Sequence, residues 1–215
     1  MNDQPGRWGR PDPMADPPSP SHLWNLPNGL TMLRLMLVPL FGYLLLVDGG
    51  QSAGARWLAA LVFVIASFTD LADGAIARSR NLVTTFGKVA DPIADKALTG
   101  VALLGLSWLG DLPWWVTVVI LGREISITLV RFVVIRHGVI PASRGGKAKT
   151  VTQMLAIFLY IVPVAGWAAS IRAPVMLIAV ALTVLTGLDY IVRAINLRNN
   201  SERTAMKRAR RAADG

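Results

Sequence analysis

The sequence contains no cysteine and only two histidines, and few of its residues are charged. The lack of cysteine excludes a disulfide framework and any thiolate nucleophile or metal ligand. Charged residues make up 16% of the 215 residues, whereas hydrophobic residues make up 53% and the mean hydropathy is +0.48. This balance is more apolar than that of an ordinary soluble domain and predicts one integral membrane domain.

Apolar runs recur along the chain, and each is about long enough to cross ~30 Å of hydrocarbon as a helix. The third run begins at Asp91, because Pro92 suits the first turn of a helix. We therefore predict an all-α integral membrane protein with six transmembrane helices, at about 30–47, 57–78, 91–109, 114–136, 151–169 and 174–197.

The two ends of the chain are polar. Residues 1–20 are rich in proline and lack the apolar region of a signal peptide, which predicts a disordered tail. Residues 21–28 fit either a short N-terminal interfacial segment or an ordinary linker. Residues 21–198 then form the membrane domain, and residues 199–215 form a basic tail that is either solvated or held at anionic headgroups.

The net charge of +9 has a distinct distribution. Basic residues flank the apolar runs and are not interleaved with aromatic residues, so a membrane surface explains them better than nucleic acid does. Lys and Arg gather in the loops after the second and fourth runs and beyond the sixth, whereas the opposite loops hold only Arg56 and Arg172. The positive-inside rule then places the basic loops and both termini in the cytoplasm.

Four aspartates lie at the edges of the second and third runs: Asp70, Asp73, Asp91 and Asp95. Each pair is three or four residues apart, so each pair shares one face of its helix. Clustered carboxylates near a membrane need compensating positive charge, and oxygen ligands favour Mg²⁺, Mn²⁺ or Ca²⁺ over zinc. Two alternatives are salt bridges to neighbouring Lys and Arg residues and the ion path of a cation transporter, although an ion path predicts acids spread across the membrane depth.

The segment from Asp70 to Asp95 resembles the signature of the CDP-alcohol phosphotransferases, also named CDP-alcohol phosphatidyltransferases. The resemblance implies that family's six-helix fold and a homodimer. The matching positions are Asp70, Asp73, Gly74, Ala77, Arg78, Gly87, Asp91 and Asp95.

The resemblance also implies roles for individual residues. Two Mg²⁺ or Mn²⁺ ions would be bound by Asp70, Asp73, Asp91 and Asp95, and Asp95 would also act as the general base. The CDP part of the lipid donor would be held by Gly74, Arg78 and Thr84, with Asn28 and Thr31 lining the same nucleotide site.

Two further stretches, at residues 120–131 and 143–157, resemble the phosphatidylglycerophosphate synthase branch of this family. That branch transfers the phosphatidyl group of CDP-diacylglycerol to glycerol 3-phosphate, releasing CMP, which implies a bacterial plasma membrane enzyme in contact with membrane lipids. The signature alone is equally consistent with inositol phosphate, serine or phosphatidylglycerol as the acceptor.

A phosphorylated acceptor needs cationic partners. The candidates are Arg123, Lys147, Lys149 and Arg193. Each has an alternative explanation: Arg123 pairs structurally beside Glu124, the two lysines set the topology, and Arg193 pairs with Asp189 four residues earlier.

Overall fold

The structure is helical throughout the part of the chain that it describes. The computed structural model describes the backbone of residues 26–80, 85–134 and 144–213, with no β-strand in these ranges, and most side chains of 29–69, 96–130 and 145–197. The predicted all-α class is confirmed for these residues. The elements are α1 (Leu26–Leu46), η2 (Val47–Gly50), α2 (Ala53–Arg80), α3 (Thr85–Trp108), α4 (Trp114–Val134), α5 (Arg144–Ile161), α6 (Trp167–Ser170) and α7 (Arg172–Ala213).

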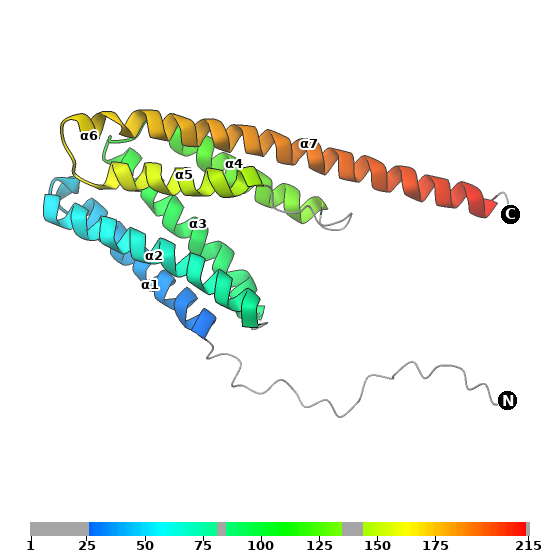
Figure 1. Cartoon of the computed structure of the whole chain (residues 1–215), viewed down its shortest axis with the longest axis horizontal. Helices are drawn as coiled ribbons and strands as arrows, with labels where there is room; N and C mark the ends of the chain where they lie inside the picture. Colours follow the sequence, from blue (N-terminus) through cyan, green and yellow to red (C-terminus); the bar gives the residue numbers. More distant parts are fainter. Residues whose placement is uncertain (1–25, 81–84, 135–143, 214–215) are drawn as a thin grey trace, which may run out of the picture.

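The long helices run alternately in opposite directions (Figure 1). The connections through η2 and α6 lie at one end, which we term the hairpin end. The last turns of α2 and α4 and the first turns of α1, α3 and α5 point toward the other end, which we term the motif end. Toward the motif end, the α1–α2 pair spreads away from the group of α4, α5 and α7, with α3 between them (Figure 1).

The helix boundaries correct several of the predicted ones. Helix α3 begins at Thr85, so Pro92 lies inside the helix and not in its first turn. Helix α5 begins at Arg144 and ends at Ile161, well before the predicted Ala169, because Pro163 follows and disfavours the helical conformation of the residue before it. Helix α7 continues past Leu197 to Ala213. An apolar run indicates where lipid can lie, whereas a helix continues for as long as its backbone hydrogen bonds do.

The predicted interfacial segment is described only at its C-terminal edge. Residues 21–25 lie outside the described residues, and Leu26 to Asn28 form the first turn of α1. These three residues are therefore part of the first long helix and not of a separate segment.

Two helical stretches, Met32–Gly50 and Arg172–Leu197, are long and apolar enough to cross a membrane. Ala53–Thr69 and Lys96–Trp108 are shorter apolar stretches. Helix α4 contains the adjacent charges of Arg123 and Glu124, which interrupt its apolar character. The six long helices follow the six predicted segments in order, but the count of six membrane crossings stays a prediction.

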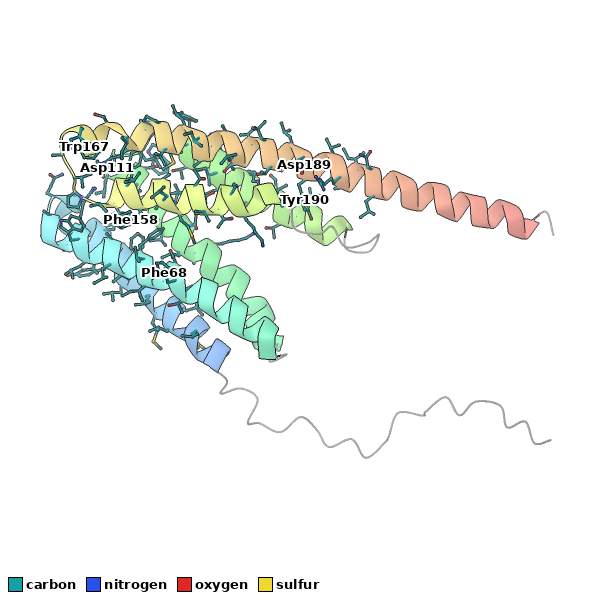
Figure 2. All side chains as sticks on the ribbon, in the orientation of Figure 1. Phe68, Asp111, Phe158, Trp167, Asp189 and Tyr190 are labelled. Carbon is teal, nitrogen blue, oxygen red and sulfur yellow. The ribbon has the colours of Figure 1, made fainter. Side chains whose placement is uncertain are left out.

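The outward faces of the helices are strongly apolar. Figure 2 shows Phe68 projecting from α2, where a row of large apolar side chains is exposed. A soluble monomer rarely exposes such continuous apolar surface, and lipid is the environment that stabilises it. Exposed positions on α2 and α7 include Trp57, Leu58, Leu61, Ile65, Phe68, Leu177, Ile178, Leu185, Leu188 and Val192.

The interior combines close packing of small residues with buried polar groups. Buried alanines such as Ala59, Ala102 and Ala156 let the helices approach one another closely. Phe41 of α1 packs against Phe63 of α2 with their ring centroids 5.7 Å apart. Buried cations lie within this apolar frame, and each of them therefore requires partners.

Arg56 joins four parts of the chain at the hairpin end. Its Nε donates to the carbonyl of Gly50 at 2.8 Å, its Nη1 donates to the carbonyl of Tyr160 at 3.3 Å, and its Nη2 forms an ion pair with Asp111. Gly50 has a φ of +71°, and a Cβ there would lie 2.7 Å from the Leu109 side chain. Glycine is therefore required where η2 meets this arginine.

Arg172 has a similar role beside it. Its Nη2 donates to the carbonyls of Val162 and Val164 at 3.0 and 2.6 Å, which satisfies acceptors just beyond the last turn of α5. Both arginines of the weakly basic side thus bind groups of the protein itself.

Replacing Arg56 with methionine should destabilise the protein markedly. The change leaves Asp111 and two carbonyls without this cation, and breaking such a partly buried ion pair costs about 3 kcal/mol. The melting temperature in detergent should fall by about 6–12 °C. As a matched control, Arg193→Met breaks an exposed ion pair with Asp189 and should shift the melting temperature by less than about 2 °C. Equal shifts in the two variants would contradict the structural role of Arg56.

Candidate active site

The segment with the resemblance spans the facing ends of two helices. Asp70, Asp73, Gly74 and Arg78 lie in the last turns of α2, and Asp91 and Asp95 lie in the first half of α3. The two helix ends lie near each other at the motif end (Figure 1). The backbone of both aspartate pairs lies toward the motif end, and the predicted cluster of their carboxylates stays a prediction.

The side chains of these residues lie outside the described ones, as do those of Asn28 and Thr31, which fall in the first turns of α1. Thr84 lies outside the described residues altogether. Among the side chains that are described, no group of three His, Asp or Glu residues could hold a metal ion. The metal prediction therefore depends on the four aspartates, whose carboxylate oxygens and shared helix faces fit Mg²⁺ or Mn²⁺.

Arg34 is a fully buried cation of α1 that sequence reasoning missed. It lies two turns before Phe41 in α1, and Asp70 lies two turns after Phe63 in the antiparallel α2. Because Phe41 and Phe63 are in contact, Arg34 and the backbone of Asp70 lie at the same level of the bundle. The sequence did contain one indication of this residue: Arg34 lies three residues after Thr31, which is predicted to line the nucleotide site, and residues three apart share one face of a helix.

Glu124 forms the centre of a charged network between α3, α4 and α5. Its carboxylate accepts a hydrogen bond from Lys149 of α5 and another from Arg123 at 3.3 Å. Its main-chain carbonyl accepts a hydrogen bond from Thr128 at 2.8 Å, and Thr128 accepts one from Lys96 of α3. Among the described side chains, three cations thus belong to a network that contains one carboxylate.

Arg123 connects the network to α7. Its Nη2 donates to the Thr186 hydroxyl at 3.1 Å. Gly187 lies directly against the Arg123 side chain, because a Cβ at that position would be 3.1 Å from the Arg123 Cγ. The absence of a side chain at residue 187 therefore lets α7 approach α4 closely enough to hold the guanidinium.

A cavity of about 270 Å³ opens beside this network, between α3, α4 and α5. It begins at Lys96, the residue after the predicted base Asp95, and Lys149 lines its α5 side. Its size lies near the lower end of the range for ligand pockets, about 300–1,000 Å³. The lining residues are Lys96, Thr99, Gly100, Leu121, Glu124, Ile125, Lys149, Thr150, Gln153 and Met154.

The four predicted acceptor ligands have different surroundings. Lys149 is 5% exposed and lines the cavity, whereas Lys147 is exposed and does not. Arg123 pairs with Glu124 at the edge of the cavity. Arg193 lies on the exposed side of α7, where its Nε donates to both carboxylate oxygens of Asp189 at 3.0 and 2.9 Å. Figure 2 shows Asp189 and Tyr190 far along α7 from Asp111 at the hairpin end.

Sequence reasoning missed the contributions of Lys96 and Gln153 to this cavity. Lys96 directly follows the signature, and Gln153 lies four residues after Lys149 on the same face of α5. The sequence shows that Gln153 and Lys149 share a helix face, but it does not show that this face of α5 lies opposite α3 and α4 across a cavity.

The chain matches the family model described as CDP-alcohol phosphatidyltransferase over residues 24–185. It is 52% identical over 171 residues to a "Probable phosphatidylglycerophosphate synthase" of Mycobacterium tuberculosis, covering 80% of this chain and 82% of that protein. It is 37% identical over 181 residues to the "CDP-diacylglycerol--glycerol-3-phosphate 3-phosphatidyltransferase" of Bacillus subtilis, covering 78% of this chain and 94% of that protein. It is also 38% identical over 154 residues to a "Cardiolipin synthase (CMP-forming)" of Streptomyces coelicolor, covering 69% of this chain and 70% of that protein. The match over most of the chain, together with the signature on α2 and α3, shows that this protein belongs to the CDP-alcohol phosphatidyltransferase family.

Proposed function

We propose that this protein transfers the phosphatidyl group of CDP-diacylglycerol to glycerol 3-phosphate, giving phosphatidylglycerophosphate and CMP. The observation that carries the proposal is the cavity that begins one residue after Asp95 and is lined by Lys96 and Lys149. Arg123 pairs with Glu124, another residue of the lining. A small anionic acceptor suits both its volume and its excess of positive charge. The names of the Mycobacterium and Bacillus relatives support the same reaction.

The proposed reaction needs one base and one leaving group. The carboxylate of Asp95 takes the proton from the acceptor's terminal hydroxyl, and the resulting oxygen attacks the phosphorus that carries the diacylglycerol. A new phosphorus–oxygen bond forms to the acceptor while the bond to the CMP oxygen breaks, and CMP leaves with the electron pair. Two divalent ions held by the four aspartates would, when bound, neutralise charge on the diphosphate.

The remaining residues position the two substrates. Gly74, Arg78 and Thr84, with Asn28 and Thr31 of the first helix, hold the CDP part of the donor in this proposal. The acyl chains stay beside the exposed apolar faces of the helices while the headgroup reaches the motif end. Glu124 holds Lys149 and Arg123 at the cavity, where they meet the phosphate of the acceptor.

We further propose that the motif end faces the cytoplasm of a bacterial cell. The relatives named above are bacterial, and the Lys and Arg residues concentrate in the connections at that end. The homodimer implied by the family resemblance stays a prediction.

A CMP-release assay with purified protein, CDP-diacylglycerol and Mg²⁺ tests the reaction. Glycerol 3-phosphate, inositol 1-phosphate, serine and phosphatidylglycerol are offered in parallel, and release should require glycerol 3-phosphate. Asp95→Asn should lower kcat by about 100-fold or more, because it removes the base. Asp48→Asn is a matched control, since Asp48 is exposed at the hairpin end and asparagine tolerates its φ of +53°.

Phosphatidylglycerol as the required acceptor would replace the proposed reaction with that of the Streptomyces relative. Absence of metal-dependent release with every acceptor would overturn the phosphatidyltransferase proposal as a whole.

The role of the cavity is tested by comparing two neighbouring lysines. Lys149→Met should raise the KM for glycerol 3-phosphate by about tenfold or more, because it removes a charge-assisted contact to the phosphate. The KM for CDP-diacylglycerol should change less than about threefold. Lys147→Met removes the same charge from an exposed position outside the cavity and should change both constants by less than about twofold. Equal effects of the two substitutions would refute the assignment of the cavity to the acceptor.

A further inference from the structure

Gln153 has an unusual environment for a polar side chain. It is 5% exposed, it lines the cavity, and it lies one helical turn from Lys149 on the same face of α5. Its Oε1 is buried and has no hydrogen-bond partner among the described residues. A buried amide oxygen without a partner is unfavourable, and such a group in a native interior requires an explanation.

The register of the helices places Gln153 deeper than the charged groups. Helix α5 runs from the motif end toward the hairpin end, so Gln153 lies one turn further inside than Lys149. Lys96 lies on the opposite wall, next to Asp95 in α3. The cavity therefore has Lys149 on its α5 wall with Gln153 one turn further inside, and Lys96 on its α3 wall.

Glycerol 3-phosphate matches this arrangement. Its phosphate and its reacting terminal hydroxyl are at opposite ends, and one further hydroxyl is on the middle carbon. With its phosphate at Lys149, the middle hydroxyl comes within reach of Gln153, which lies one helical turn away on the same face of α5. An amide can donate to or accept from a hydroxyl, depending on which of its two ends faces the ligand.

We infer that Gln153 determines acceptor specificity by hydrogen-bonding the middle hydroxyl of glycerol 3-phosphate. The inference rests on the proposed function. It accounts for a buried amide oxygen that has no partner among the described residues, because the missing partner arrives with the substrate. A site built to bond a hydroxyl discriminates strongly against an analogue that lacks it.

The test compares glycerol 3-phosphate with 3-hydroxypropyl phosphate, which keeps the phosphate and the terminal hydroxyl but has no middle hydroxyl. In the CMP-release assay with the full chain, the unmodified protein should prefer glycerol 3-phosphate by about tenfold or more in kcat/KM. Gln153→Met should reduce this preference to less than about twofold, chiefly by lowering kcat/KM for glycerol 3-phosphate. Gln51→Met makes the same change at an exposed position of the hairpin end and should retain the full preference.

Thermal stability supplies a second readout. Because the amide oxygen has no partner in the described interior, Gln153→Met should leave the melting temperature unchanged or raise it. A fall in melting temperature, with equal losses of activity toward both acceptors, would show a structural role and overturn the inference.

Failure of the inference can be distinguished from failure of the proposed function. If the unmodified protein releases CMP with glycerol 3-phosphate but shows no preference over the analogue, or if Gln153→Met keeps that preference, only the role of Gln153 is wrong. If the unmodified protein releases no CMP with glycerol 3-phosphate, the proposed function fails and the inference fails with it.

Discussion

The arrangement of the candidate site depends on the ion pairs that the carboxylate of Glu124 forms with Lys149 and Arg123. A lone anion within an apolar helix bundle is costly unless cations surround it, and here Lys149 and Arg123 do so. These contacts fix α5 against α4, and through Thr186 they reach α7. The cations outnumber the carboxylate, so the same network that joins the helices leaves positive charge at the edge of the cavity. The network thereby joins α4, α5 and α7 and supports the proposal that the cavity binds an anion.

The two ends of the bundle use buried arginine in different ways. At the hairpin end, Arg56 and Arg172 bind main-chain carbonyls and Asp111, and their contacts are internal to the protein. Toward the motif end, the α1–α2 pair spreads away from α4, α5 and α7 (Figure 1). Lys96 and Lys149 line a cavity between the middle parts of α3, α4 and α5. A bundle that is fastened at one end can hold charged groups at the other without closing over them. The helices thus converge at the hairpin end, where arginine contacts join them, and the signature residues lie toward the opposite end.

Much of this organisation could be predicted from the sequence because it follows from local periodicity. The apolar runs gave six long helices in the correct order, and the spacing of Asp70, Asp73, Asp91 and Asp95 assigned them to the adjoining parts of two helices. The predicted C-terminal ends of α5 and α7 were wrong, because hydropathy indicates which residues can contact lipid and does not indicate where a helix ends. The partners of Glu124 and the burial of Arg34 could not be predicted, because they depend on which helix faces which. Lys147 and Lys149 illustrate this limit: they are two residues apart and chemically identical, and only packing separates them.

The location of the cavity also bears on how members of one family can differ in acceptor. The signature on α2 and α3 is equally consistent with several acceptors, so it does not identify the alcohol. The cavity that we propose for the acceptor is lined by residues of α3 beyond the signature and by residues of α4 and α5. Substitutions on α4 and α5 can change the charge or the hydrogen-bonding groups of the cavity without replacing an aspartate of the signature. On the proposed function, acceptor specificity can vary largely independently of the chemistry, because most of the cavity lining comes from α4 and α5, and α3 alone contributes to both where Asp95 is followed by Lys96.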